Sequence, residues 1–279
     1  MTQIHESVSA AKKACKTQTD HDISVKESLQ KIKNKFIVLS GKGGVGKTSV
    51  AVNLAMALAD RGFSVGIMDV DLHGPDVPRM LGLKGMLDLG KNQKLSPMNY
   101  SRNLKAVSIE SLSASKDDAI IWRGPLKNSA IRQFISEVEW GQLDYLIIDS
   151  PPGTGDEPLT VAQTIPDARA IIVTTPQEVA LADVRKSINF CKVLKMEIFG
   201  LIENMSWFSC PHCQEMIDLF GSGGGAKTAA AAGIRFLGKI PFDINVVACG
   251  DSGTSFQKKY NDSQVTKAFA EITEIIIAS

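Results

Sequence analysis

Short apolar runs alternate with amphipathic stretches along most of this chain. The apolar runs predict strands over residues 36–39, 65–68, 104–109, 145–148, 170–173, 199–202 and 234–240. Apolar residues at helical spacing predict helices over 24–35, 49–61, 127–138, 159–164, 182–194 and 264–277. Strands that alternate with helices predict an α/β fold, in which a mostly parallel β-sheet has helices on both faces.

Polar residues follow several of the predicted strands directly. In sheets of this kind ligands bind at the carboxyl ends of the strands. The conspicuous positions here are 41–48, 69–71, 149 and 204. We find no internal repeat and no low-complexity linker, so we predict one domain over residues 36–279. Residues 1–35 are predicted to form a polar N-terminal arm with a short helix.

Composition and charge limit the classes of binding partner and the cellular location that we expect. The 279 residues carry 31 basic and 30 acidic side chains, a net charge of +1, which gives no sign of a nucleic-acid or anionic-membrane partner. No apolar run approaches the roughly 20 residues of a membrane span, and the N-terminus lacks the apolar core of a secretory signal. Five cysteines, an odd number, favour a reducing cytoplasm over a disulfide framework.

Residues 41–48, GKGGVGKT, match the phosphate-loop pattern G-x-x-x-x-G-K-[ST]. Glycines let successive backbone N–H groups converge on phosphate oxygens, and the following helix adds its positive end. Lys47 is predicted to reach the β- and γ-phosphates, and Thr48 to offer its hydroxyl to Mg²⁺. The predicted nucleotide-binding residues of this segment are Gly41, Lys42, Gly43, Gly44, Val45, Gly46, Lys47, Thr48 and Ser49.

Carboxylates at two other strand ends complete the expected site. Asp149 ends an apolar strand and is predicted to hold Mg²⁺ opposite Thr48. Asp69 and Asp71 flank one residue, so strand alternation would put them on the same face. In that arrangement Asp71 orients the attacking water and Asp69 lies nearer the metal. The predicted catalytic residues are Lys42, Lys47 and Asp71. The alternative is that the two aspartates cap the loop before residues 73–75.

The base is predicted to be adenine. Guanine readers commonly carry an Asn-Lys-x-Asp pattern, and here Asn204 stands alone. We expect Asn204 to touch the amino edge of adenine, with Pro241 and Asp243 in the segment that walls the base; the alternative is a strand-end turn asparagine. A second glycine-rich stretch, 221–228, has Ala226 where a phosphate loop needs glycine, so it predicts only a flexible turn before a helix.

The loop holds a second lysine, Lys42, on the side away from Lys47. An added cation neutralises charge that develops on a transferring phosphoryl group. In one subunit we expect Lys42 to point away from its own nucleotide, and beside a second copy it could reach the partner's phosphates. The loop resembles the deviant Walker A loop of the MinD/ParA/nitrogenase-iron-protein class. That resemblance implies an ATP-sandwich dimer in which Lys42 crosses the interface; the alternative is a solvated loop lysine.

Cys210 and Cys213 are separated by two residues, a spacing at which two thiols can grip one metal centre. They are half of a four-thiolate site, and a twofold dimer would supply the other half. Four thiolates suit Zn²⁺ as well as an iron–sulfur cluster, and ligand count does not separate the two. A thiol–disulfide role is less favoured, because no evident helix begins at Cys210. Cys15 is interpreted as an exposed arm thiol, and Cys191 and Cys249 as packed residues.

Taken together, these segments resemble the Mrp/ApbC/Nbp35 family of iron–sulfur cluster carriers. The segments IVLSGKGGVGKTS, DVDLHGPDVPRMLG, DYLIIDSPPGTGD, ENMSWFSCPHC, FGSGGG and FLGKIPFD occur in family order over about residues 36–275. The resemblance implies slow ATP hydrolysis with Mg²⁺, a homodimer that holds a [4Fe-4S] cluster between its subunits, and transfer of that cluster to apo iron–sulfur proteins. Because Cys15 stands alone in the N-terminal arm, we expect no four-cysteine cluster of the Nbp35 type, and we expect the short polar arm in place of the accessory domain of many bacterial members.

The main alternative is a MinD/ParA-type ATPase switch with a structural zinc clasp. The MinD branch typically ends in an amphipathic membrane helix, but residues 268–277 contain Glu271 and Glu274 and no basic residue. DNA-binding ParA members need a basic surface. Nitrogenase-type reductases have single, widely spaced cluster cysteines, unlike Cys210 and Cys213. These differences favour the carrier.

Overall fold

The computed structural model describes residues 23–71, 74–88, 94–112 and 124–279. Within them one sheet contains nine strands in the order β3-β4-β2-β5-β1-β6-β7-β8, and β9 also pairs with β7. The short strands β3 and β8 are antiparallel to their neighbours, and the other pairs are parallel. The strands are β1 (Ile32–Ser40), β2 (Val65–Asp69), β3 (Met98–Asn99), β4 (Leu104–Ser108), β5 (Leu143–Asp149), β6 (Arg169–Thr174), β7 (Ile198–Ser209), β8 (Met216–Ile217) and β9 (Phe236–Phe242).

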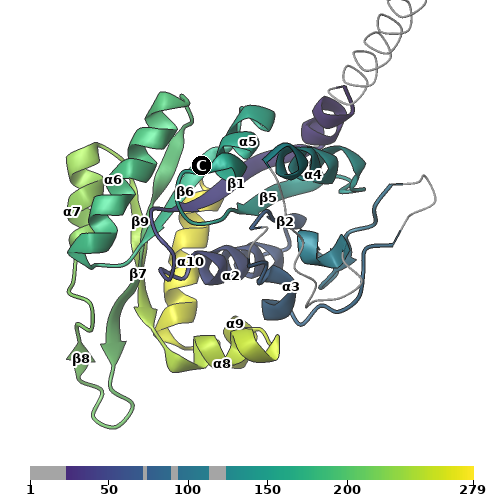
Figure 1. The fold of residues 1–279 in the computed structure, drawn as a ribbon. Helices are drawn as coiled ribbons and strands as arrows, with labels where there is room; N and C mark the ends of the chain where they lie inside the picture. Colours follow the sequence, from purple (N-terminus) through teal and green to yellow (C-terminus); the bar gives the residue numbers. More distant parts are fainter. Residues whose placement is uncertain (1–22, 72–73, 89–93, 113–123) are drawn as a thin grey trace, which may run out of the picture.

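Helices cover both faces of this sheet, as predicted (Figure 1). One buried core lies between the sheet and the helices α2 and α10, and a second lies beneath α4, α5 and the helical residues 23–30. No helix of the described residues is long and apolar enough to cross a membrane. The helices are α2 (Lys47–Asp60), α3 (Val77–Met80), α4 (Gly124–Glu137), α5 (Asp156–Thr164), α6 (Glu178–Val193), α7 (Gly224–Ala232), α8 (Ile244–Ser252), α9 (Phe256–Lys259) and α10 (Gln264–Ile277), with a 3-10 turn η1 (Ile109–Leu112).

The first strand begins earlier than its apolar run suggests. We predicted a helix over 24–35, but the helical residues end at 30 and β1 begins at Ile32, which pairs with Leu143. Lys33 and Lys35 interrupt the apolar pattern in this part of the strand, so the sequence does not show where β1 begins. The ammonium of the buried Lys35 donates hydrogen bonds to the Ile32 carbonyl at 2.8 Å and to Asp167 at 2.7 Å, so a charged side chain occupies a core position.

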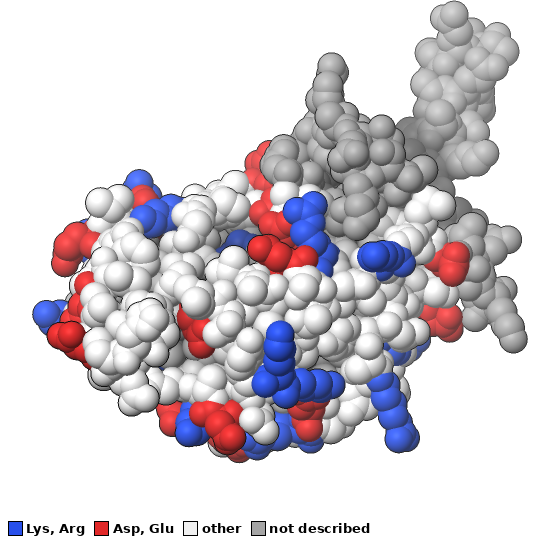
Figure 2. Space-filling model, turned by 90° about the horizontal axis from the view of Figure 1, so that it is seen from below, with Lys and Arg blue, Asp and Glu red and all other residues white. Residues whose placement is uncertain are grey.

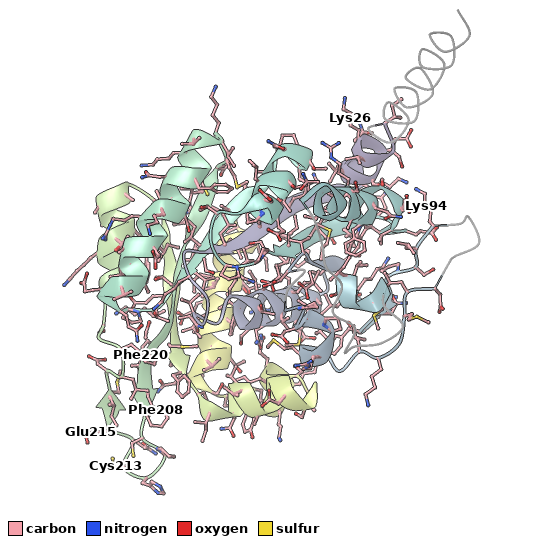
Figure 3. The ribbon with its side chains drawn as sticks, in the orientation of Figure 1. Lys26, Lys94, Phe208, Cys213, Glu215 and Phe220 are labelled. Atoms are coloured by element: carbon pink, nitrogen blue, oxygen red, sulfur yellow. The ribbon has the colours of Figure 1, made fainter. Side chains whose placement is uncertain are left out.

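Strand β7 extends well past the predicted end at residue 202. It pairs with β6 as far as Glu203, and its last residues pair with β8 in an antiparallel hairpin. The apolar signal stops at 202 because Glu203, Asn204 and Ser206 follow, although all three are buried. The hairpin projects from the body of the protein and carries Cys213 at its tip (Figures 1 and 3). Tertiary contacts, rather than local pattern, therefore carry this strand outward.

Acidic and basic side chains are interspersed on the face of the molecule shown in Figure 2. Among the described residues on that face, no continuous basic area is seen. This distribution matches the near-neutral composition of the chain.

Candidate nucleotide site and cysteine hairpin

The glycine-rich loop joins β1 to α2 in the middle of the sheet. Gly46, the last residue before α2, has φ +76°, in the left-handed region that glycine adopts without steric cost. A Cβ on Gly46 would also lie well under 3.0 Å from the side-chain amide nitrogen of Asn204. The loop therefore requires glycine at this position both for its backbone turn and for the neighbouring side chain.

Lys47, Thr48 and Asp149 come together where α2 begins and β5 ends. The Lys47 ammonium donates to one oxygen of Asp149 at 2.5 Å, and the Thr48 hydroxyl donates to the other at 2.7 Å. Lys47 and Asp149 are both buried. Burial raises the pKa of Asp149, and the Lys47 charge opposes that rise. A hydroxyl beside a carboxylate is the kind of oxygen donor set that suits Mg²⁺.

Asp69 and Asp71 take different positions. Asp69 is fully buried opposite Asp149 in the β2–β5 register, and it accepts hydrogen bonds from the backbone N–H groups of Asp71 at 3.0 Å and Val77 at 3.2 Å. Burial and the nearby Asp149 charge raise the pKa of Asp69 well above its ordinary value. Because β2 ends at Asp69, the following turn positions Asp71, whose carboxylate accepts from the Gly74 N–H at 3.2 Å.

These hydrogen bonds are the ones expected if the two aspartates cap the loop that follows β2. His73, within that loop, lies outside the described residues. The water-orienting role of Asp71 and the metal-side role of Asp69 therefore stay predictions.

A cavity of about 370 Å³ lies beside the loop, between the middle of β7, the end of β9 and the helices α3, α8 and α10. Its volume suits a small ligand. Five residues predicted from the sequence line it: Gly46, Ser49, Asn204, Pro241 and Asp243. Asn204 also donates from its amide to the Val45 carbonyl at 2.8 Å, which ties β7 to the phosphate loop. Asp243 caps α8 by accepting from the Asn245 N–H at 2.8 Å.

Sequence reasoning missed other residues that line the cavity. Asp76 and Arg79 come from the α3 segment, and Val246 and Gly250 from α8. Asp76 and Arg79 lie within the DVDLHGPDVPRMLG motif, which could have suggested them. The α8 residues carry no such signal, because only the packing of α8 brings them to the phosphate loop.

The two loop lysines point apart. The Lys42 ammonium donates to the Gln177 side chain at 3.1 Å, at the start of α6 beyond β6, whereas Lys47 binds Asp149 beyond β5. Strands β5 and β6 flank β1 on opposite sides. Lys42 is thus directed away from the Lys47 side of its own loop. Its action on a partner's phosphates stays a prediction.

Cys210 and Cys213 occupy the turn of the β7–β8 hairpin (Figure 3). The Cys210 N–H donates to the Glu215 carbonyl at 2.9 Å, and Cys213 is exposed. Hydrogen bonds from the backbone N–H groups of Cys213 and His212 lower the pKa of the Cys210 thiol. The turn therefore favours the thiolate, which is the form that binds metal. Within the described residues, no three His, Cys, Asp or Glu side chains gather into a metal site.

The remaining cysteines have different surroundings. Cys191 and Cys249 are buried, as expected for packed residues, and burial raises the pKa of Cys191 to about 12. Cys15 lies outside the described residues. In the second glycine-rich stretch, residues 221–223 form a turn and residues 224–228 begin α7, so a helix follows the turn as predicted.

A parallel sheet whose central strand leads through a glycine-rich loop into a helix, with a lysine, a threonine and a strand-end aspartate converging there, defines a P-loop nucleoside triphosphatase. The family model described as "ParA: NUBPL iron-transfer P-loop NTPase" matches residues 31–277, and the chain belongs to this family. The family membership and the fold confirm the resemblance and the fold class predicted from the sequence.

Two curated relatives illustrate the match. The chain is 46% identical over 263 residues to the iron-sulfur cluster carrier protein of Methanocaldococcus jannaschii, which covers 94% of this chain and 90% of the relative. It is 48% identical over 242 residues to the cytosolic Fe-S cluster assembly factor NUBP2 homolog of Dictyostelium discoideum, with 84% and 91% covered.

Among solved structures, the chain is similar to a nucleotide-binding protein from Archaeoglobus fulgidus in complex with ADP. The TM-score is 0.74 and the identity 41%, with 84% of this chain and 92% of that chain covered. The cell division ATPase MinD of Pyrococcus furiosus, at 23% identity and a TM-score of 0.65, shares the fold.

Proposed function

We propose that this protein is an ATP-hydrolysing iron–sulfur cluster carrier that holds a [4Fe-4S] cluster between two copies of the chain and passes it to apoproteins. The observation that carries this proposal is the projecting hairpin of a P-loop NTPase, on which Cys210 and Cys213 offer two thiol ligands. Relatives at 44–48% identity are named as iron–sulfur cluster carriers or Fe-S cluster assembly factors, which supports the cargo but not the cluster type.

The nucleotide half of the proposal rests on the phosphate loop and its neighbours. Lys47 binds the β- and γ-phosphates, while Thr48 and Asp149 hold Mg²⁺, which supplies positive charge against the phosphates. Asn204, Pro241 and Asp243 face adenine in the adjoining cavity. The relative from Archaeoglobus fulgidus was solved with ADP, which supports an adenine nucleotide here.

Hydrolysis then uses groups outside the metal pair. Asp71 orients the attacking water, and Asp69 lies nearer the metal. Lys42, directed away from its own Lys47, neutralises charge on the nucleotide of the second copy. This assignment makes the dimer a requirement for turnover, not for nucleotide binding.

The cluster half rests on ligand number. Two thiols on each chain become four when two hairpins meet, and four thiolates complete a [4Fe-4S] site. Met216 and Ile217 on β8 are 63% and 40% exposed, an apolar surface beside the cysteines that suits contact with a second copy. Recipients are apo iron–sulfur proteins. The relatives named as cytosolic assembly factors support a cytoplasmic location.

Zinc is the competing occupant, since four thiolates hold Zn²⁺ equally well. In that case the protein is an ATPase switch with a structural clasp. The deciding experiment is anaerobic reconstitution with iron and sulfide, followed by an absorption spectrum and iron, sulfide and zinc analyses. We expect a broad charge-transfer band with about four irons and four sulfides per dimer.

Two variants sharpen this experiment. Cys213→Ala should abolish the band and leave ADP binding intact. Cys249→Ala, which removes a buried thiol away from the hairpin, should keep the band. Tightly held zinc that resists replacement by iron would contradict the carrier function.

A further inference from the structure

Strand β7 changes its surroundings abruptly at residues 203–206, between the nucleotide cavity and the cysteine hairpin. Asn204 contacts the phosphate loop, and both Asn204 and Met205 line the cavity. Between Asn204 and Phe208 the pairing with β9 is irregular: four residues of β7 advance against the two from Ile240 to Phe242. The hairpin follows at once. Any strain or motion that passes between nucleotide and cysteines along β7 has to cross this junction.

Glu203 is buried at that junction, with its side chain completely shielded from solvent. Its carboxylate accepts from the N–H groups of Gly225 at 2.5 Å and Gly223 at 3.2 Å, at the start of α7, and from the Ser206 hydroxyl at 2.9 Å. Lys239 of β9 lies 4.0 Å away. The glycine-rich turn that imitates a phosphate loop thus binds an anion, and that anion is the protein's own carboxylate.

This turn is the point where the chain returns from the hairpin. Residues 207–209 leave the junction toward the cysteines, and residues 218–223 bring the chain back to α7. Glu203, which precedes the outgoing segment 207–209, therefore binds the end of the returning segment 218–223 at the start of α7. A Cβ on Gly225 would lie 2.9 Å from the Glu203 carboxylate, so the fit leaves no room for a side chain there.

Met205 adds a second feature. Its φ is +55°, a conformation that costs free energy for any residue other than glycine and persists only where the surroundings impose it. Here the flanking residues impose it, since Asn204 is held by the phosphate loop and Ser206 by Glu203. Strained residues of this kind cluster at switch regions, so Met205 is a place where movement between the ligand cavity and the projecting hairpin could be controlled.

We propose that Glu203 is a positioning residue that couples the nucleotide cavity to the cysteine hairpin, by clamping Ser206 and the α7 turn around Met205. The inference rests on the proposed function for its meaning, because it assigns the route by which nucleotide controls access to the cluster ligands. A ligand that moves Asn204 or Met205 shifts the hairpin as a unit while the clamp is intact. Without the clamp the two arms move independently.

The test measures thiol reactivity in the full-length, reduced, cluster-free protein. Cys210 and Cys213 are alkylated with iodoacetamide with and without saturating Mg-ADP, and the rates are resolved by mass spectrometry of each peptide. ADP is used because hydrolysis then plays no part. For the natural protein we expect ADP to change the hairpin rates by about fivefold or more, the lower range of coupling between linked sites.

In Glu203→Gln the amide keeps the shape of the side chain but turns N–H groups toward N–H donors of α7. We expect this variant to bind ADP and to lose the ADP response, with a rate ratio close to 1. Gly225→Ala displaces the same carboxylate from outside the cavity and should lose it too. Glu215→Gln, on the exposed hairpin, is the matched control and should keep it.

Unreactive Cys191 and Cys249 report that each variant is folded. A natural protein whose hairpin rates ignore ADP would overturn the inference, as would a folded Glu203→Gln or Gly225→Ala variant that retains the full response. Cluster reconstitution is scored separately. A protein that shows the ADP response but takes up no iron would refute the carrier function and leave this coupling standing.

Discussion

The close approach of Asn204 to the phosphate loop predicts an unusually costly glycine substitution. In Gly46→Ala the new methyl group would clash with the Asn204 amide nitrogen, and alanine would have to adopt a backbone φ of +76°. The left-handed backbone alone costs about 1–2 kcal/mol for a residue with a Cβ. Moving Asn204 breaks its 2.8 Å bond to the Val45 carbonyl, which adds about 0.5–1.5 kcal/mol. We expect a total loss of roughly 1.5–3.5 kcal/mol in the free energy of unfolding.

The chain offers a matched control at Gly62, which follows α2 with φ +90° and has no atom within 4 Å of the position that an alanine methyl would take. Gly62→Ala should cost only the conformational part. In an Asn204→Ala background the clash at position 46 disappears, so Gly46→Ala should then cost about as much as Gly62→Ala. The Met205 methyl, 3.3 Å from the new atom, is a flexible chain end and can move.

Urea unfolding of the nucleotide-free variants, followed by circular dichroism and compared at a common m-value, measures these differences. Nucleotide is left out because binding would stabilise the variants unequally. The double variant should be more stable than the sum of the single losses predicts, by about 1 kcal/mol. Strict additivity, or a Gly46→Ala loss no larger than that of Gly62→Ala, would refute the steric reasoning.

Three further predictions concern ionisable side chains. Lys47→Met leaves the buried Asp149 charge unpaired and should destabilise the protein by about 3–5 kcal/mol at neutral pH. Because burial raises the pKa of Asp149, this loss of stability should shrink as the pH falls toward about 4. A loss that does not change with pH in urea unfolding would contradict the prediction. Lys42→Ala should lower ATP turnover by roughly tenfold or more with ADP binding preserved, since a cation supplied in trans contributes strongly to phosphoryl transfer; unchanged turnover would remove its interface role. At pH 7.5 iodoacetamide should label Cys210, whose pKa the turn amides lower, well before Cys191, whose pKa is about 12, and equal peptide labelling would disprove this order.

The sequence alone determined the class of fold and the chemistry of the phosphate loop. Both depend on residues that are close together in the sequence. Strands and helices follow from short periodic runs, and residues 41–48 form a contiguous motif in which Lys47 and Thr48 have fixed positions. The carboxyl ends of the central strands β1, β2, β5 and β6 were also right to within one residue, because polar residues stop the apolar runs where these strands meet the ligand edge.

Tertiary structure decided the features that depend on burial of polar groups. Lys35 and Glu203 look like surface residues in the sequence, yet both are buried, because Asp167, 132 residues beyond Lys35, and the α7 turn, 20 to 22 residues beyond Glu203, supply their partners. The same holds for the cavity, where α8 is brought beside Gly46 only by packing. Whether a charged side chain is buried depends on partners that the local sequence does not reveal. Pairs such as Asn204 and Val45, 159 residues apart, come into contact only once the sheet has formed.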